Sequence, residues 1–154
     1  IPVQELLDAA GKYFKKLMKN RPERIELEIE SMEAKVIGDV NQLRFLLENL
    51  IDEALTVRED GVIRLQARKD NEYIRFLFTD TRREKSVEEL NQLFYPNLAR
   101  MTSGEKGELR GTEYLVCKQI IRDHDEFAGR RGCRINAEPA EGGGFTVYFT
   151  IPRR

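Results

Sequence analysis

An amide and two carboxylates are spaced to act together in the stretch GDVNQLRFLLENLIDEALT, which begins at Gly38. Asn49 and Glu53 stand four residues apart and so project from one side of a helix, with Asp52 beside them. Oxygen groups of this kind bind a divalent cation or the waters around it. An ordinary core helix with a polar outer face has the same spacing, so the pattern leaves both interpretations open.

A third carboxylate, Asp80, ends a stretch that alternates as a strand does. Ile74, Phe76 and Phe78 share one face of the strand 73–80, and Asp80 has the same parity. It should therefore point toward the apolar side, where a carboxylate without a partner is costly. We expect it to receive a donor from a ligand at the end of the sheet or from the protein, for example by capping the loop that follows.

Composition limits the function classes. A chain of 154 residues with 40% hydrophobic and 34% charged residues suits one domain with a sizeable core. The net charge of −1 argues against general binding to nucleic acid or to an anionic membrane. Cys117 and Cys133 have no metal-ligand spacing and fit a reducing cytoplasm better than a disulfide framework. Because the first residue is Ile1 rather than Met, we expect a fragment of a longer protein, with residues 1–154 as a single domain.

Periodicity predicts an α+β fold. Apolar steps of three and four residues indicate helices, and strict alternation indicates strands. Residues 33–37 offer a possible hairpin partner for the first strand. We expect a two-layer α/β sandwich, with a mixed, mostly antiparallel sheet covered on one face by the three longer helices. The expected helices span 3–19, 39–57, 86–94 and 112–127, and the expected strands span 24–30, 62–68, 73–80, 133–137 and 145–151.

The order of these elements and their motifs resembles the catalytic ATP-binding domain of sensor histidine kinases, which shares its Bergerat-type fold with DNA gyrase B and the Hsp90 chaperones. The resemblance covers nearly the whole chain. It rests on a helix motif of the type N-L-x-x-N-A, an Asp followed by a short helix, and a final apolar helix with two closing strands. The matching residues are Asp39, Leu43, Asn49, Leu50, Ala54, Asp80, Thr81, Leu90, Phe94, Pro96, Gly111, Lys118, Ile120, Ile121, His124 and Pro152, with GGGFTVYFTIP at the end.

The resemblance implies a nucleotide site. It places Asn49, Glu53, Asp80, Gly107 and Gly111 at this site, with Asp80 at the adenine amino group. Asn49 and Glu53 would meet the magnesium ion and the phosphates. The loop 98–111 corresponds to the lid over ATP, and no catalytic residue is assigned.

Several residues depart from the family pattern where nucleotide would be touched. Glu53 replaces the magnesium-binding Asn, although a carboxylate oxygen also suits magnesium. Arg82 and Glu84 stand where two glycines let the backbone turn against adenine, and they add bulk. Glu113 replaces a glycine at the helix start that receives phosphate, and its charge suits the helix dipole in place of an anion. We therefore expect ATP and magnesium to bind weakly or not at all.

Three functions follow from the resemblance. The first is the ATP-binding-type domain of a histidine kinase-like signalling protein with weak or lost nucleotide binding, a pseudokinase domain of a two-component system. The second is a working kinase domain that uses Glu53 for magnesium. The third is a nucleotide-free interaction or scaffold module. The expected partners are upstream domains of the same parent chain, a response regulator or a homodimer partner, with no nucleic acid, no membrane contact and a cytoplasmic location.

Overall fold

The computed structural model describes residues 1–95, 102–103, 109–110, 113–129 and 132–154. Its main sheet has five strands in the order β1-β2-β3-β7-β6. The strands β1 and β2 run parallel, and the other neighbouring pairs run antiparallel. The strands are β1 (Ile25–Ile29), β2 (Gly61–Asp70), β3 (Tyr73–Asp80), β6 (Ile135–Pro139) and β7 (Phe145–Pro152).

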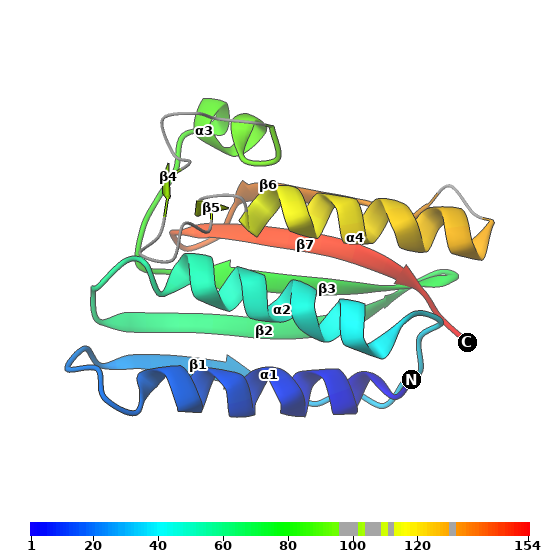
Figure 1. Cartoon of the computed structure of the whole chain (residues 1–154), viewed down its shortest axis with the longest axis horizontal. Coiled ribbons are helices and arrows are strands. Elements are labelled where there is room, and N and C mark those ends of the chain that lie inside the picture. Colours follow the sequence, from blue (N-terminus) through cyan, green and yellow to red (C-terminus); the bar gives the residue numbers. More distant parts are fainter. Residues whose placement is uncertain (96–101, 104–108, 111–112, 130–131) are drawn as a thin grey trace.

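Three helices lie side by side over one face of this sheet, as Figure 1 shows. They are α1 (Val3–Met18), α2 (Val40–Ala54) and α4 (Glu113–Ala128), while the short α3 (Val87–Gln92) lies beyond the β6 side of the sheet. The expected α+β sandwich with a mixed, mostly antiparallel sheet is confirmed. Both termini lie at the end where α2 begins.

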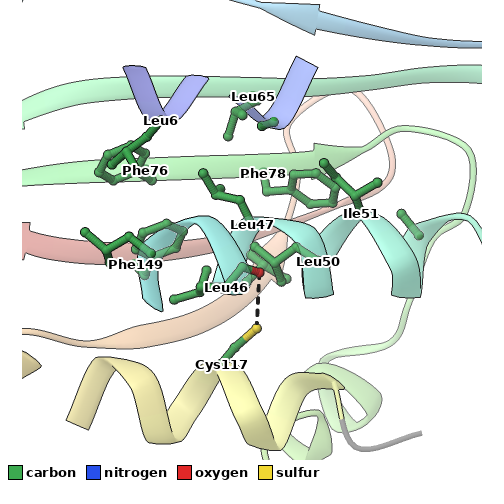
Figure 2. Close-up of a cluster of buried hydrophobic side chains, with 14 of the residues drawn as sticks. Leu6, Leu46, Leu47, Leu50, Ile51, Leu65, Phe76, Phe78, Cys117 and Phe149 are labelled. Carbon is green, nitrogen blue, oxygen red and sulfur yellow. Dashed lines mark hydrogen bonds between the residues drawn. The ribbon is translucent and has the colours of Figure 1, made fainter. Parts of the chain in front are cut away.

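The core fills the space between the helices and the sheet. Leu6 of α1, Leu47 of α2 and Phe76 of β3 are each at most 2% exposed, and Figure 2 shows them among their neighbours. The Phe76 and Phe149 rings stack with centroids 4.9 Å apart. Cys117 is fully buried and its Sγ donates to the Leu46 carbonyl over 3.6 Å, so α4 packs on α2 there. Cys117 thus has a packing role in the core, at the contact between these two helices.

Local signals in the sequence set the helix ends. The Asp39 carboxylate accepts from the Gln42 backbone N–H and caps α2. Ser86 and Glu89 form a reciprocal capping box at the start of α3. Burial alternates along β3 from Tyr73 to Phe78, so Ile74, Phe76 and Phe78 face the helices, and the strand is buried throughout at Thr79 and Asp80.

Two details differ from the expectations. Residues 33–37 do not return as a hairpin partner of β1, because β1 pairs with β2 and only isolated bridges join Lys35 to Pro2 and Val36 to Arg153. The expected loop before α4 contains the strand pair β4 (Thr102–Ser103) and β5 (Leu109–Arg110). Two-residue strands are too short to show a period of two, which explains why composition alone indicated only a loop.

Candidate nucleotide site

Asp80 ends β3 with its carboxylate inside the protein. It is 3% exposed, as its parity predicted. The chain turns immediately after it, and the Arg82 backbone N–H donates to Asp80 Oδ1 over 3.0 Å. The turn before β7 comes so close that a Cβ on Gly144, which has φ +84°, would lie 2.1 Å from the Asp80 carbonyl oxygen. Only glycine fits there.

The partner of the Asp80 carboxylate is the Arg82 guanidinium. Arg82 Nε donates to Oδ1 and Nη2 donates to Oδ2, each over 2.9 Å, in a bidentate pair whose side chains are 1% and 5% exposed. A bidentate arginine–carboxylate pair is among the strongest hydrogen-bonded ion pairs in proteins. The loop-capping alternative for Asp80 is therefore the one that the structure shows, with the donors supplied by the protein.

The rest of the Arg82 guanidinium closes the end of α2. Nη2 donates to the Ala54 carbonyl over 2.6 Å, and Nη1 donates to the Val57 and Glu59 carbonyls over 2.9 and 3.0 Å. All five guanidinium N–H groups thus have an acceptor, and three carbonyls at and beyond the helix end have a donor. Sequence reasoning identified Arg82 as bulk but missed this role, because the acceptors come from a segment 23–28 residues earlier.

A glycine at the start of β2 makes room for this side chain. A Cβ on Gly61, which has φ +147°, would lie 2.5 Å from Arg82 Cγ. Asp60-Gly61 is also a turn signal in the sequence. Its second role is to leave space for the aliphatic part of the Arg82 side chain. The sequence does not show this role, because β2 and the end of β3 are adjacent only in space.

A small cavity remains beside the pair. Its volume is about 50 Å³, enough for one or two water molecules, whereas pockets for drug-sized ligands hold roughly 300–1,000 Å³. Its rim carries Glu53, Arg83 and Lys85, and the Lys85 ammonium lies 5.4 Å from the centre of the Phe145 ring. The other lining residues are Leu50, Ala54, Thr56, Val57, Phe78, Asp80, Tyr114, Phe145 and Val147.

The expected site residues are only partly brought together. Glu53 and Asp80 line the same cavity, whereas Asn49 is 8% exposed and donates back to the Phe45 carbonyl of its own helix over 2.7 Å. Gly107 and Gly111 lie outside the described residues. Within the residues that the structure describes, no group of three His, Cys, Asp or Glu side chains is arranged to hold a metal ion.

His124 sits in the last turns of α4, away from this cavity. It is 5% exposed; Nδ1 lies 2.8 Å from the Ile120 carbonyl, and Nε2 accepts from the Asp39 backbone N–H over 3.0 Å. These contacts pack His124 at the end of its helix and link α4 to the start of α2. In the described part of the chain, no helix is long and apolar enough to cross a membrane.

A five-stranded mixed sheet with a buried Asp at the end of β3 and helices on one face defines a class of ATPase-like domains. Residues 38–154 match the family model described as histidine kinase-, DNA gyrase B-, and HSP90-like ATPase. The chain therefore belongs to this family. No protein with a curated description matches it in sequence.

Solved structures share the fold. The mycobacterial sensor histidine kinase MprB is 19% identical with a TM-score of 0.75, and the match covers 100% of this chain and 96% of that one. Full-length ShkA in complex with AMPPNP is 17% identical with a TM-score of 0.75, covering 99% and 30%. Histidine kinase ThkA in complex with the response regulator TrrA is 18% identical with a TM-score of 0.74, covering 100% and 41%.

Proposed function

We propose that this chain is the ATP-binding-type domain of a sensor histidine kinase-like signal transduction protein whose nucleotide binding is weak or lost. The observation that carries the proposal is the Asp80–Arg82 pair. Both carboxylate oxygens of Asp80, the residue expected at the adenine amino group, already accept from the Arg82 side chain. Oδ1 accepts from both the Arg82 backbone N–H and Nε, and Oδ2 accepts from Nη2. An adenine amino group would therefore have to share Oδ2 with the buried guanidinium or displace it, and displacement carries a large desolvation and pairing cost.

Two further features support weak binding. The cavity formed by the described residues is far smaller than an ordinary ligand pocket. Glu53 at its rim adds a negative charge where the phosphates and metal of ATP would approach. Repulsion between like charges in a partly dry site is poorly screened by salt.

A second candidate is a working kinase domain. The observation in its favour is that Glu53 and Asp80 line one cavity, so a carboxylate suited to the metal and a carboxylate suited to the base lie close together. The third candidate, a scaffold module without nucleotide, needs only the folded domain.

Partners belong to the same proposal. ThkA was solved with a response regulator and ShkA with AMPPNP. We infer for this chain upstream domains of its own parent, with a response regulator or a second copy as further partners. We also infer a location in the cytoplasm, where its two buried cysteines would stay reduced.

Titration calorimetry with magnesium-ATP, ADP and a non-hydrolysable analogue tests the proposal. We expect a dissociation constant weaker than about 1 mM, which corresponds to at most about 4 kcal/mol of binding free energy. Melting curves with and without nucleotide give a second readout, because a ligand that binds only the folded state raises the melting temperature.

The contrary outcome is equally defined. Micromolar binding that requires magnesium, and that disappears in Asp80→Asn and Glu53→Ala, would contradict weak or lost nucleotide binding and favour the working kinase domain. Arg83→Ala serves as the control, since Arg83 lines the same cavity but pairs with the exposed Glu59. No response to any nucleotide by a folded domain supports loss of binding and makes the interaction module the better account of its role.

A further inference from the structure

The β1 strand forms one edge of the five-stranded sheet, and one row of its backbone groups faces outward. The Arg24 carbonyl accepts from Gly61 and the Glu30 N–H donates to Leu65, so the peptide groups of the even-numbered residues point to β2. Because successive residues of a strand point their peptide groups to opposite sides, those of Ile25, Leu27 and Ile29 point away from β2. Such an edge is a template for another strand.

A groove runs along this edge, between β1 and α1. Its volume is about 660 Å³. Gly11 stands in the middle of the helix wall, and a Cβ there would lie 3.1 Å from Ile29 Cδ1, so a side chain at this position would narrow the groove. We call this surface the β1 edge groove. Its lining residues are Asp8, Gly11, Lys12, Phe14 and Lys15 of α1 with residues 26–29 of β1.

The two faces of β1 differ in chemistry. Leu27 and Ile29 are half-buried on the helix side, where Phe14 is buried beside them. Glu26, Glu28 and Glu30 are exposed on the open face of the sheet. Neighbours on β2 only partly neutralise the glutamates, since Glu28 meets Arg64 over 3.1 Å and Glu30 accepts from Gln66 over 2.6 Å.

An added strand must follow the same alternation. Side chains at every second position would enter the groove and should be apolar, while those between them would lie beside the three glutamates. A second copy of β1 is a poor occupant, because an antiparallel pair would set glutamate against glutamate on the open face, and like charges opposite each other are destabilising. Lysine or arginine at these positions is complementary.

We propose that the β1 edge groove binds an extended peptide segment in which apolar residues alternate with lysine or arginine, added as a sixth strand beside β1. Main-chain hydrogen bonds to Ile25, Leu27 and Ile29 supply the pairing. The groove selects apolar side chains on one face of the segment, and the glutamates select cations on the other. This surface is separate from the Asp80 cavity, so the proposal does not depend on nucleotide.

A synthetic peptide with the sequence KVKIKVK, capped at both ends, is the probe. In an antiparallel strand, the residues opposite Ile25, Leu27 and Ile29 are the apolar ones, and their N–H groups face β1. N-methylation of the valines and isoleucine should weaken binding at least about tenfold, because two or three hydrogen bonds are lost. N-methylation of the lysines is the matched control for antiparallel addition, and the two results exchange if the strand adds in parallel.

Variants of the protein test the side-chain part. Glu26→Lys should weaken binding of the KVKIKVK peptide and favour the acidic peptide EVEIEVE, whereas the same charge change at the exposed Glu33, outside the groove, should have little effect. Gly11→Leu should also weaken binding. Melting curves verify folding of each variant, and amide chemical shifts should move first at Ile25, Leu27 and Ile29.

Four results would overturn the proposal. Equal binding of both methylated peptides would mean simple electrostatic adhesion rather than strand addition. Equal effects of Glu26→Lys and Glu33→Lys would place the peptide elsewhere. No binding of KVKIKVK at millimolar concentration would leave the glutamates with the single role of discouraging edge-to-edge pairing. Concentration-dependent dimers in sedimentation would make a second copy of the chain the occupant of the groove.

Discussion

At the scale of single residues, the Arg82 side chain combines several contacts that one amino acid rarely makes at once. It neutralises a buried carboxylate, closes the end of α2 and anchors the loop before β2. Arginine suits this place because its planar fork carries five donors in fixed directions. A lysine has three donors around one nitrogen and could not reach the carboxylate and the three carbonyls together.

Removal of this guanidinium should be severely destabilising. In Arg82→Met the Asp80 carboxylate stays buried without its cation, and breaking a buried pair costs about 3–5 kcal/mol. Arg83→Met is the matched control, because its pair with Glu59 is about half exposed and exposed pairs contribute about 0–1 kcal/mol. Urea unfolding of both variants measures the difference.

The double variant Asp80→Leu with Arg82→Met separates the energetic contribution of the ion pair from that of side-chain packing. Replacing both partners by apolar groups should cost less than Arg82→Met alone, since no unpaired charge remains. An Arg82→Met protein as stable as the parent would show that water or the loop takes over the contacts of Arg82.

At the scale of elements, a hydrogen bond between two helices gives the domain a specific alkaline response. The phenol O–H of Tyr13 in α1 donates a hydrogen bond to Asp52 Oδ1 of α2 over 2.6 Å. Burial raises the pKa of Tyr13 far above its usual value, and the bond to the Asp52 carboxylate raises it further. A raised pKa means that the folded state holds the phenol proton more tightly than the unfolded state does.

The sign of the pH dependence follows. The contribution of Tyr13 is fully present below the unfolded pKa of about 10 and is lost as the pH rises above it. Tyr13→Phe should therefore be less stable than the parent by about 1 kcal/mol at pH 8, and the difference should shrink between pH 10 and 11. Urea unfolding across this range measures it, with the exposed Tyr95→Phe as control. A difference that stays constant with pH would mean that Tyr13 contributes only by packing.

Elements with strong periodicity were predictable, and those set by distant partners were not. The apolar face of α2 and the alternation in β3 each follow from a single stretch of sequence. The predictions of this helix, of this strand and of the inward direction of Asp80 were therefore correct. The pairing of β1 with β2 joins strands that are adjacent only in space, and residues 33–37 fitted a hairpin equally well on local grounds. Likewise, Arg82 was recognised as an unusual residue, but its acceptors lie on another element.

At the scale of the whole molecule, the first 37 residues are part of the same body as the rest. The family model begins at residue 38, yet α1 packs on α2, and β1 extends the sheet beside β2. The N-terminal amino group donates to the Val36 carbonyl, and Ile37 donates to the Pro152 carbonyl near the other end of the chain. The boundary of sequence similarity is therefore not a boundary of packing.

A chain shortened to residues 38–154 should fail to fold cooperatively. Five apolar residues of α1 are buried, and the four larger ones contribute roughly 6–12 kcal/mol of transfer free energy, which is as large as the whole stability of a typical domain, about 5–15 kcal/mol. Circular dichroism and thermal melting measure the effect. Within the full chain, Leu6→Ala should cost about 2–5 kcal/mol, while the exposed Lys16→Ala on the same helix should change stability by less than about 0.5 kcal/mol. A sharp melting transition of the 38–154 protein would instead show that α1 and β1 are an addition to a core that is complete without them.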